Sequence, residues 1–209
     1  MRPLPPALVL LTLAACGPAQ STTAGTSSWT NPGEGAVGAT SGTDAERFFP
    51  LVHGHIWQYA TSSDEGDRGV LVLRAHRTDA RHGELRTPSG ARRIEYMPEG
   101  VGLAGLGVFI LKTPLAPGTT WRGEHGGTAR ITESNATVDV PAGRFSGCVI
   151  AVEERGGDRP VRYTTTFCPD VGITRLSVEA GLASERAELR SYGPPVSIGP
   201  DGNSFTPPP

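Results

Sequence analysis

The sequence predicts an all-β protein, either an antiparallel sandwich or a strongly curved open sheet, built from two related β units. Three observations lead to this fold class. The 28 glycines and 19 prolines among 209 residues favour turns and short strands over helices. Short windows of alternating apolar and polar residues recur along the chain. A sequence motif occurs twice, and two copies of one unit are expected to share one core.

The alternating pattern predicts ten strands between clusters of turn residues. They are expected at residues 56–61, 70–77, 84–87, 92–97, 107–112, 128–140, 145–155, 161–168, 172–179 and 186–192.

The repeated motif has the form P-L-x-x-G-x-x-W and predicts units of about 48–111 and 112–180. Proline fixes φ, leucine is expected to be buried, and glycine permits a tight turn with positive φ. Tryptophan then begins a strand and covers the end of the core. A weaker echo joins residues 96–103 to 167–173. The motif residues are Pro50, Leu51, Gly54 and Trp57 in the first copy and Pro114, Leu115, Gly118 and Trp121 in the second.

One hairpin can be placed from its turn, the Gly-Gly-Asp-Arg-Pro cluster at residues 156–160. With Asp158 at its centre, Cys148 lies opposite Cys168, and a Glu–Arg pair lies nearer the turn on the same face. Directly opposed residues come within disulfide reach, so a bridge is predicted. Two free buried thiols are the alternative.

The N-terminus has the plan of a secretory signal: Arg2, an apolar run over 8–13, then small residues before Cys16. The run is too short to span a bilayer, which takes about 20 apolar residues. The Leu-Ala-Ala-Cys sequence that ends at Cys16 resembles the lipobox of bacterial lipoproteins. This resemblance implies that residues 1–15 are removed, that Cys16 is acylated (for example with palmitate) and that the lipid anchors the protein in a membrane. Gly17 in place of aspartate implies the outer membrane. An ordinary signal peptide with a chance cysteine is the alternative.

Residues 16–44 are rich in Ser, Thr, Gly and Pro and are predicted to form a lipidated flexible tether. Residues 45–192 form the predicted β domain, and residues 193–209 a disordered proline-rich tail.

Three further segments occur in the order FPLxxGxxW from residue 48, VPAGRF over 140–145 and PDVGI over 169–173. They resemble a type of envelope lipoprotein that carries the same segments in the same order. The resemblance implies a secreted β domain in the cell envelope and brings no catalytic residue. Its structural positions here include Pro141, Gly143, Phe145 and Gly172.

The candidate chemical sites favour structural roles, so no enzyme, metal or cofactor is predicted. His53 and His55 are the one close histidine pair, and two ligands do not make a zinc site. The acidic segment 64–67 lacks the ligand spacing of a calcium loop and is expected at a hairpin tip. No Gly-x-Ser-x-Gly elbow occurs. The formal charge of −2 excludes the basic footprint of a nucleic-acid binder.

Two functions are therefore expected. The first is a non-enzymatic accessory protein at the outer membrane, on its periplasmic face or the cell surface, which binds an envelope protein or polymer. Exposed aromatic residues at the Trp57/Trp121 edge would favour it. The alternative is a carrier of a hydrophobic ligand in a concave β face, which needs a continuous apolar lining. Residues 70–73 and 101–111 could supply that lining, and could equally be ordinary core. The sequence predicts no oligomeric state.

Overall fold

In a computed structural model the chain divides into two units, residues 1–39 and 40–209. The structure describes residues 44–194, 197–198 and 204–205, all in the second unit. Cys16, the predicted signal and nearly all of the predicted tether lie outside the described residues, as does most of the predicted tail. Within the described ranges the one helix is α1 (Asp44–Phe48), and none is long and apolar enough to cross a membrane.

Fourteen strands are present in the described part of the chain. They are β1 (Ile56–Ser63), β2 (Arg68–Arg77), β3 (His82–Thr87), β4 (Gly90–Met97), β5 (Gly100–Leu103), β6 (Val108–Lys112), β7 (Thr120–Arg122), β8 (Thr128–Val140), β9 (Gly143–Arg155), β10 (Val161–Cys168), β11 (Gly172–Ala180), β12 (Ala183–Gly193), β13 (Ser197–Ile198) and β14 (Ser204–Phe205).

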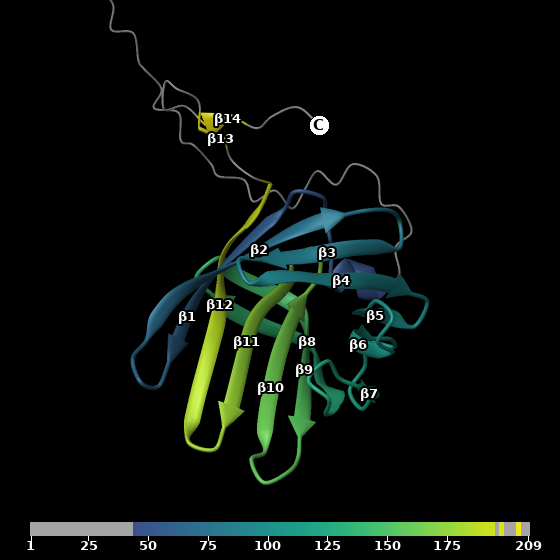
Figure 1. The fold of residues 1–209 in the computed structure, drawn as a ribbon, viewed down its shortest axis with the longest axis vertical. Coiled ribbons are helices and arrows are strands. Elements are labelled where there is room, and N and C mark those ends of the chain that lie inside the picture. The colour runs from purple at the N-terminus through teal and green to yellow at the C-terminus, as the bar shows by residue number, and fades with distance from the viewer. Residues whose placement is uncertain (1–43, 195–196, 199–203, 206–209) are drawn as a thin grey trace, which may run out of the picture. The chain divides into compact units, whose positions relative to one another are not determined.

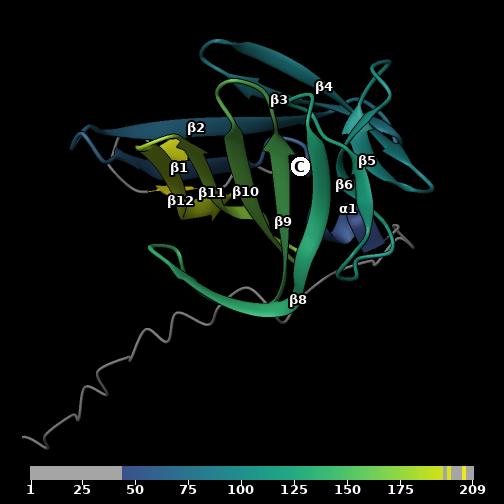
Figure 2. The same ribbon diagram turned by 90° about the horizontal axis from the view of Figure 1, so that it is seen from below.

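Twelve of these strands form one antiparallel sheet in the order β6-β5-β4-β3-β2-β1-β12-β11-β10-β9-β8-β7, and β13 pairs with β14 separately. The sheet curls strongly, and the outer half of the β8–β9 hairpin bends away from the rest (Figures 1 and 2). The curl brings the two end strands together. Where they meet, the Trp121 indole of β7 donates a hydrogen bond to the Phe109 carbonyl of β6 (3.0 Å). The all-β prediction is confirmed, and the curved sheet is the form that the chain adopts.

The sheet consists of two six-stranded meanders, β1–β6 and β7–β12, joined through the β1–β12 pair. One copy of the repeated motif leads into β1 and the other into β7. Gly54 and Gly118 have positive φ angles of 82° and 93°, as their turns require. The second meander runs to Gly193, beyond residue 180. Buried residues of both meanders form one core.

The β9–β10 hairpin has the predicted register. Arg162 pairs with Glu154 and Phe167 with Val149, so the turn is centred on Asp158. The predicted disulfide between Cys148 and Cys168 is present, with Cα atoms 4.2 Å apart and both residues fully buried. The bridge lies where the two strands leave the ladder.

Five short elements were not predicted: β5, β7, α1, and the two-residue strands β13 and β14, which lie in the predicted tail. Strand β5 has four residues, and two of them, Gly100 and Gly102, are glycines where the alternating pattern calls for polar side chains. A Cβ on Gly102 would lie 2.4 Å from the Val108 carbonyl oxygen, so the close approach of β6 excludes a side chain there. Strand β7 has three residues and α1 has five, which is too short for a periodic pattern.

Candidate functional site

The concave face of the sheet is lined with apolar side chains, because successive residues of a strand point to opposite faces. In β2, Leu71 and Leu73 lie opposite Tyr59 and Trp57 of β1 and face inward. Val70 lies on the convex face and is 59% exposed. The side chains of the apolar run in β2 therefore alternate between the concave face and the solvent-exposed convex face.

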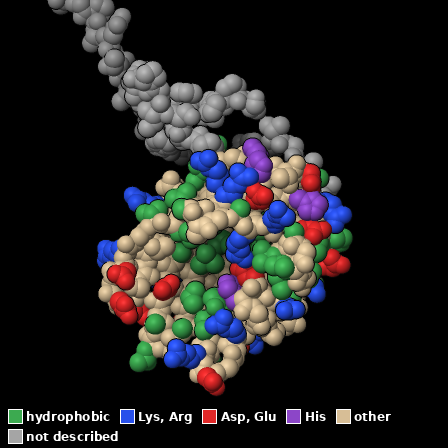
Figure 3. All heavy atoms as spheres, in the orientation of Figure 1, with side chains coloured by type: hydrophobic (Ala, Val, Ile, Leu, Met, Phe, Trp, Pro, Cys, Tyr) green, Lys and Arg blue, Asp and Glu red, His purple; other side chains and the backbone are tan. Residues whose placement is uncertain are grey.

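These inward side chains enclose a hollow of about 290 Å³. Seven apolar residues from both meanders define its wall and remain partly exposed: Leu71, Leu73, Leu85, Ile110, Ile173, Leu176 and Val178. Figure 3 shows the hollow as an apolar depression with charged and histidine side chains at its margin. Small-molecule sites have volumes of roughly 300–1,000 Å³, so the hollow is at the lower end of that range.

One end of the hollow is closed by the segment that follows α1. Phe49 packs inside with 4% of its surface exposed. The Tyr96 hydroxyl fixes this segment by donating to the Phe49 carbonyl (2.6 Å) and accepting from the Leu51 N–H (3.0 Å). The Tyr59 hydroxyl donates to the Ile173 carbonyl (2.8 Å), and burial raises the pKa of this phenol. These tyrosines have their polar atoms satisfied, so this end is apolar.

The other end is polar. A second hollow of about 430 Å³ shares Leu71, Leu176 and Val178 with the first and continues it towards the tips of the β1–β2 and β11–β12 hairpins. Its wall includes Arg68 and Glu185, which are exposed. The concave face therefore changes along its length from apolar to polar.

A buried carboxylate organises the side of the hollow near the β7–β8 turn. Glu153 of β9 is 6% exposed and accepts hydrogen bonds from the backbone N–H groups of His125 (2.9 Å) and Gly127 (2.8 Å). Its second oxygen is 2.9 Å from His125 Nδ1. The His125 ring stacks on Tyr163, which pairs with Glu153 across the ladder (ring centroids 3.7 Å, planes 5° apart). Because a carboxylate only accepts, Nδ1 carries the hydrogen and Nε2 points away from Glu153.

The neighbouring Glu124 links this cluster to the other meander. Its carboxylate forms an ion pair with Arg92 of β4 and lies 3.7 Å from His125 Nε2. The Arg92 side chain is 49% exposed and that of Glu124 18%. Gly123, next to Glu124, is required by close packing, since a Cβ there would lie 2.1 Å from the Glu153 carboxyl carbon. The turn is thus built around Glu153.

The two motif tryptophans are buried, Trp57 with 4% and Trp121 with 6% of its surface exposed. The Trp57 indole donates to the Val171 carbonyl (2.8 Å), as Trp121 does to Phe109. An exposed aromatic edge, which would have favoured an adaptor, is therefore not formed by these two residues. Both tryptophans therefore cover the end of the core, as the sequence predicts.

The other predicted positions serve the fold. Four of them surround the closed end of the hollow: Pro50, Leu51, Trp57 and Gly172. The copies Pro114, Leu115 and Gly118 belong to the connection between β6 and β7. Pro141 and Gly143 are at the β8–β9 turn, and the Phe145 ring packs edge-on against Tyr192.

The histidine pair is not a metal centre in the described residues, where no three His, Cys, Asp or Glu side chains converge. The His53 ring packs on His76 with centroids 4.7 Å apart, and the His55 ring packs edge-on against Trp57. Burial lowers the pKa of His55. The two side chains therefore make separate contacts.

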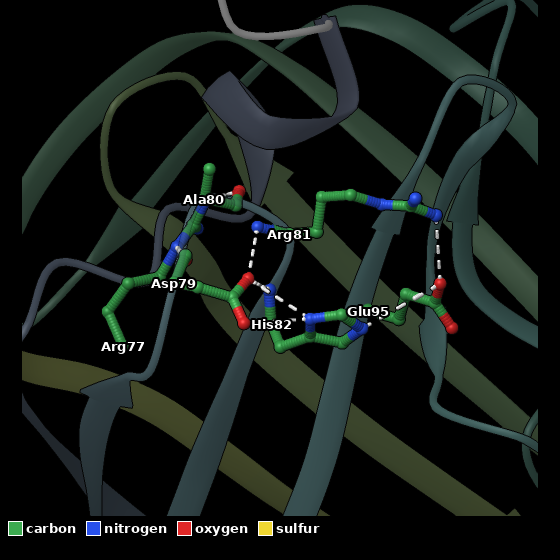
Figure 4. Close-up of polar contacts among 6 residues, drawn as sticks. All are labelled: Arg77, Asp79, Ala80, Arg81, His82 and Glu95. Atoms are coloured by element: carbon green, nitrogen blue, oxygen red, sulfur yellow. Dashed lines mark hydrogen bonds and ion pairs between the residues drawn. The ribbon is translucent and has the colours of Figure 1, made fainter.

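A second polar cluster stabilises the β2–β3 turn (Figure 4). Asp79 accepts hydrogen bonds from the backbone N–H groups of Arg81 (2.7 Å) and His82 (2.8 Å), and the His82 ring lies 3.0 Å away. The Arg81 N–H and the His82 ring hold the pKa of this carboxyl below its usual range. Arg81 also donates to Glu95 (3.1 Å). None of these residues lines the hollow, and the cluster is an exposed turn.

Sequence reasoning missed the cluster of Arg92, Glu124, His125 and Glu153. One signal was present: Glu153 occupies the same face of β9 as Val149 and Ala151, so a charge interrupts an apolar stripe. The partners of Glu153 are distant in sequence, and only the curl of the sheet brings Arg92 to Glu124.

The chain matches no protein-family profile and no curated protein. Two solved structures are similar in fold. One is a predicted lipoprotein from Parabacteroides distasonis, with a TM-score of 0.45 and 14% identity over 72% of this chain and 100% of that chain. The other is a predicted exported protein with a YmcC-like fold from Bacteroides fragilis, with a TM-score of 0.45 and 13% identity over 70% of this chain and 98% of that one. Neither likeness is close.

Proposed function

We propose that this protein is a cell-envelope lipoprotein that binds a small apolar or amphiphilic ligand on the concave face of its sheet. The observation that supports the proposal is the hollow of about 290 Å³, whose apolar wall comes from both meanders and stays partly exposed. Apolar surface left in contact with water costs roughly 25 cal/mol per Å², which a bound apolar ligand would recover. The protein acts by binding.

The same observation favours a carrier over the adaptor. Docking a macromolecule is favoured by a large exposed apolar patch. Here the exposed large apolar side chains in the described residues are scattered: Val70 and Val72 share the convex face of β2, whereas Leu106 and Leu182 lie in separate turns. The larger group of adjoining, partly exposed apolar side chains is that of the hollow.

Filling the hollow should abolish ligand binding. In the Leu71→Trp variant an indole would occupy the concave face, and we expect the affinity for the neutral apolar probe N-phenyl-1-naphthylamine to fall by about tenfold or more. The measurement is fluorescence titration of residues 17–209, secreted into the periplasm of an expressing bacterium behind a cleavable signal peptide that carries no lipobox. Native mass spectrometry of the same preparation should show an added mass that is lost on denaturation and is absent from the variant.

The matched control is Val70→Trp, which puts the same ring on the convex face of the same strand. It should bind the probe like the parent protein. Equal loss in both variants, or no probe binding by a parent protein whose fold is verified by circular dichroism, would rule out the hollow as the binding site.

The proposed location rests on Cys16 and its lipobox-like sequence. When the full chain is expressed in a bacterium fed radiolabelled palmitate, we expect label on the protein and recovery with the outer membrane. Several acyl chains are needed for stable anchoring. The Cys16→Ser variant should carry no label and should leave the membrane fraction. A labelled variant, or a parent chain that fractionates with soluble periplasmic proteins, would contradict the anchor.

A further inference from the structure

One positively charged side chain faces into the main, apolar hollow from its wall. Arg92 of β4 lies directly opposite Leu85 of β3 and so shares the concave face with it. Among the described residues that line the main hollow, Arg92 is the one lysine or arginine. A charged group on this face can contact a ligand that fills the hollow.

Arg92 is paired with the protein's own carboxylate. Glu124 comes from the other meander, just before β8, and its carboxylate lies between the Arg92 guanidinium and His125 Nε2. His125 is held in place by Glu153 and by its stack on Tyr163. Two nitrogen groups from two different halves of the sheet thus converge on one anionic group.

The second carboxylate of the cluster does not compete for this position. Glu153 already accepts from two backbone N–H groups and from His125 Nδ1. It is buried, whereas the Arg92 side chain is about half exposed. The ion pair in which another anion can replace the protein's own carboxylate is therefore the one between Arg92 and Glu124.

We propose that the ligand is an amphiphile with a single anionic head group, a carboxylate or a phosphate, on an apolar chain. The head group displaces the Glu124 carboxylate and binds the Arg92 guanidinium beside the His125 ring, while the chain lies along Leu71, Leu73 and Ile173. Glu124 holds the position in the free protein. Guanidinium groups bind carboxylates and phosphates through paired hydrogen bonds, which gives the site its selectivity for an anion. This inference rests on the function proposed above.

The test compares head groups on one chain length: dodecanoate, dodecyl phosphate and dodecan-1-ol, each below its micelle concentration. Their affinities are measured by displacement of N-phenyl-1-naphthylamine from the secreted chain. We expect at least one anion to bind more tightly than the alcohol. Arg92→Gln should lose about tenfold in affinity for that anion, with alcohol binding nearly unchanged. Glu124→Gln should bind the anion more tightly than the parent protein, because Arg92 has then lost its internal partner.

Arg93→Gln is the matched control, since Arg93 is the next residue of β4, is exposed and pairs with Glu84 on the opposite face. It should bind all three compounds like the parent. If Arg92→Gln does not fold, Arg92→Lys serves instead and should keep part of the preference for the anion. Tighter binding of the phosphate or of the carboxylate identifies the head group.

Three results would overturn the inference. The alcohol binds as tightly as both anions, Arg92→Gln and Arg93→Gln behave alike, or Glu124→Gln weakens anion binding. Each of these leaves the apolar carrier intact if the probe is still displaced. Failure of the probe itself to bind removes the proposed function as well, so the two failures are distinguishable.

Discussion

Replacing Trp57 by alanine is expected to lower the free energy of unfolding by about 3–5 kcal/mol, the usual cost of deleting a large buried aromatic side chain. The Trp57 ring is 4% exposed and lies at the closed end of the hollow. Its indole N–H also satisfies the Val171 carbonyl in the β10–β11 turn (2.8 Å). The variant would therefore lose both core packing and a link between the two meanders. Urea unfolding followed by circular dichroism measures the change.

A Trp57→Phe variant separates these two contributions. It keeps an aromatic ring but leaves the Val171 carbonyl without its donor, which costs roughly 1–3 kcal/mol when the group is buried. Val72→Ala on the convex face is the control and should change stability by about 0.5 kcal/mol or less. A Trp57→Ala protein as stable as this control would show that Trp57 does not close the core.

Loss of the Cys148–Cys168 bridge is the second large effect. The bridge closes a loop with a sequence separation of 20, for which the chain-entropy relation gives about 3 kcal/mol. The Cys148→Ser, Cys168→Ser double variant should be less stable by about that amount in urea unfolding. Serine keeps the side chains small, and a loss beyond about 3 kcal/mol would measure the cost of burying two hydroxyls.

The same measurement on the parent protein with and without a thiol reductant provides the control. The parent should lose stability on reduction, and the double variant should not respond. A parent protein whose urea midpoint is the same with and without reductant, while thiol titration shows free cysteines, would show that the bridge contributes nothing.

The sequence predicted the local structure well where physical constraints act over a few residues. Alternation identified ten of the twelve strands of the main sheet, because one face of each is apolar. The turn centred on Asp158 fixed the register of β9 and β10. Strand β5 was missed because Gly102 is dictated by the approach of β6, which is a tertiary constraint.

The candidate site could not be predicted in this way. Whether alternating strands form a sandwich or curl around a hollow depends on how the two meanders join, and β1 pairs with β12 from the far end of the domain. The sequence left open whether residues 70–73 line a concave face or are core, and the curl leaves Leu71 and Leu73 partly exposed. The contact between Arg92 and Glu124 crosses from one meander to the other and has no local signature.

The meeting of β6 and β7 also has a consequence for association between molecules. A strand at the end of a sheet normally presents unpaired N–H and C=O groups that can recruit a strand from another chain, which is a route to aggregation. Here the two end strands face each other, and the Trp121 indole occupies the Phe109 carbonyl. A foreign strand would have to separate them first. The closed seam thus lowers the tendency of the folded domain to aggregate through its sheet edges.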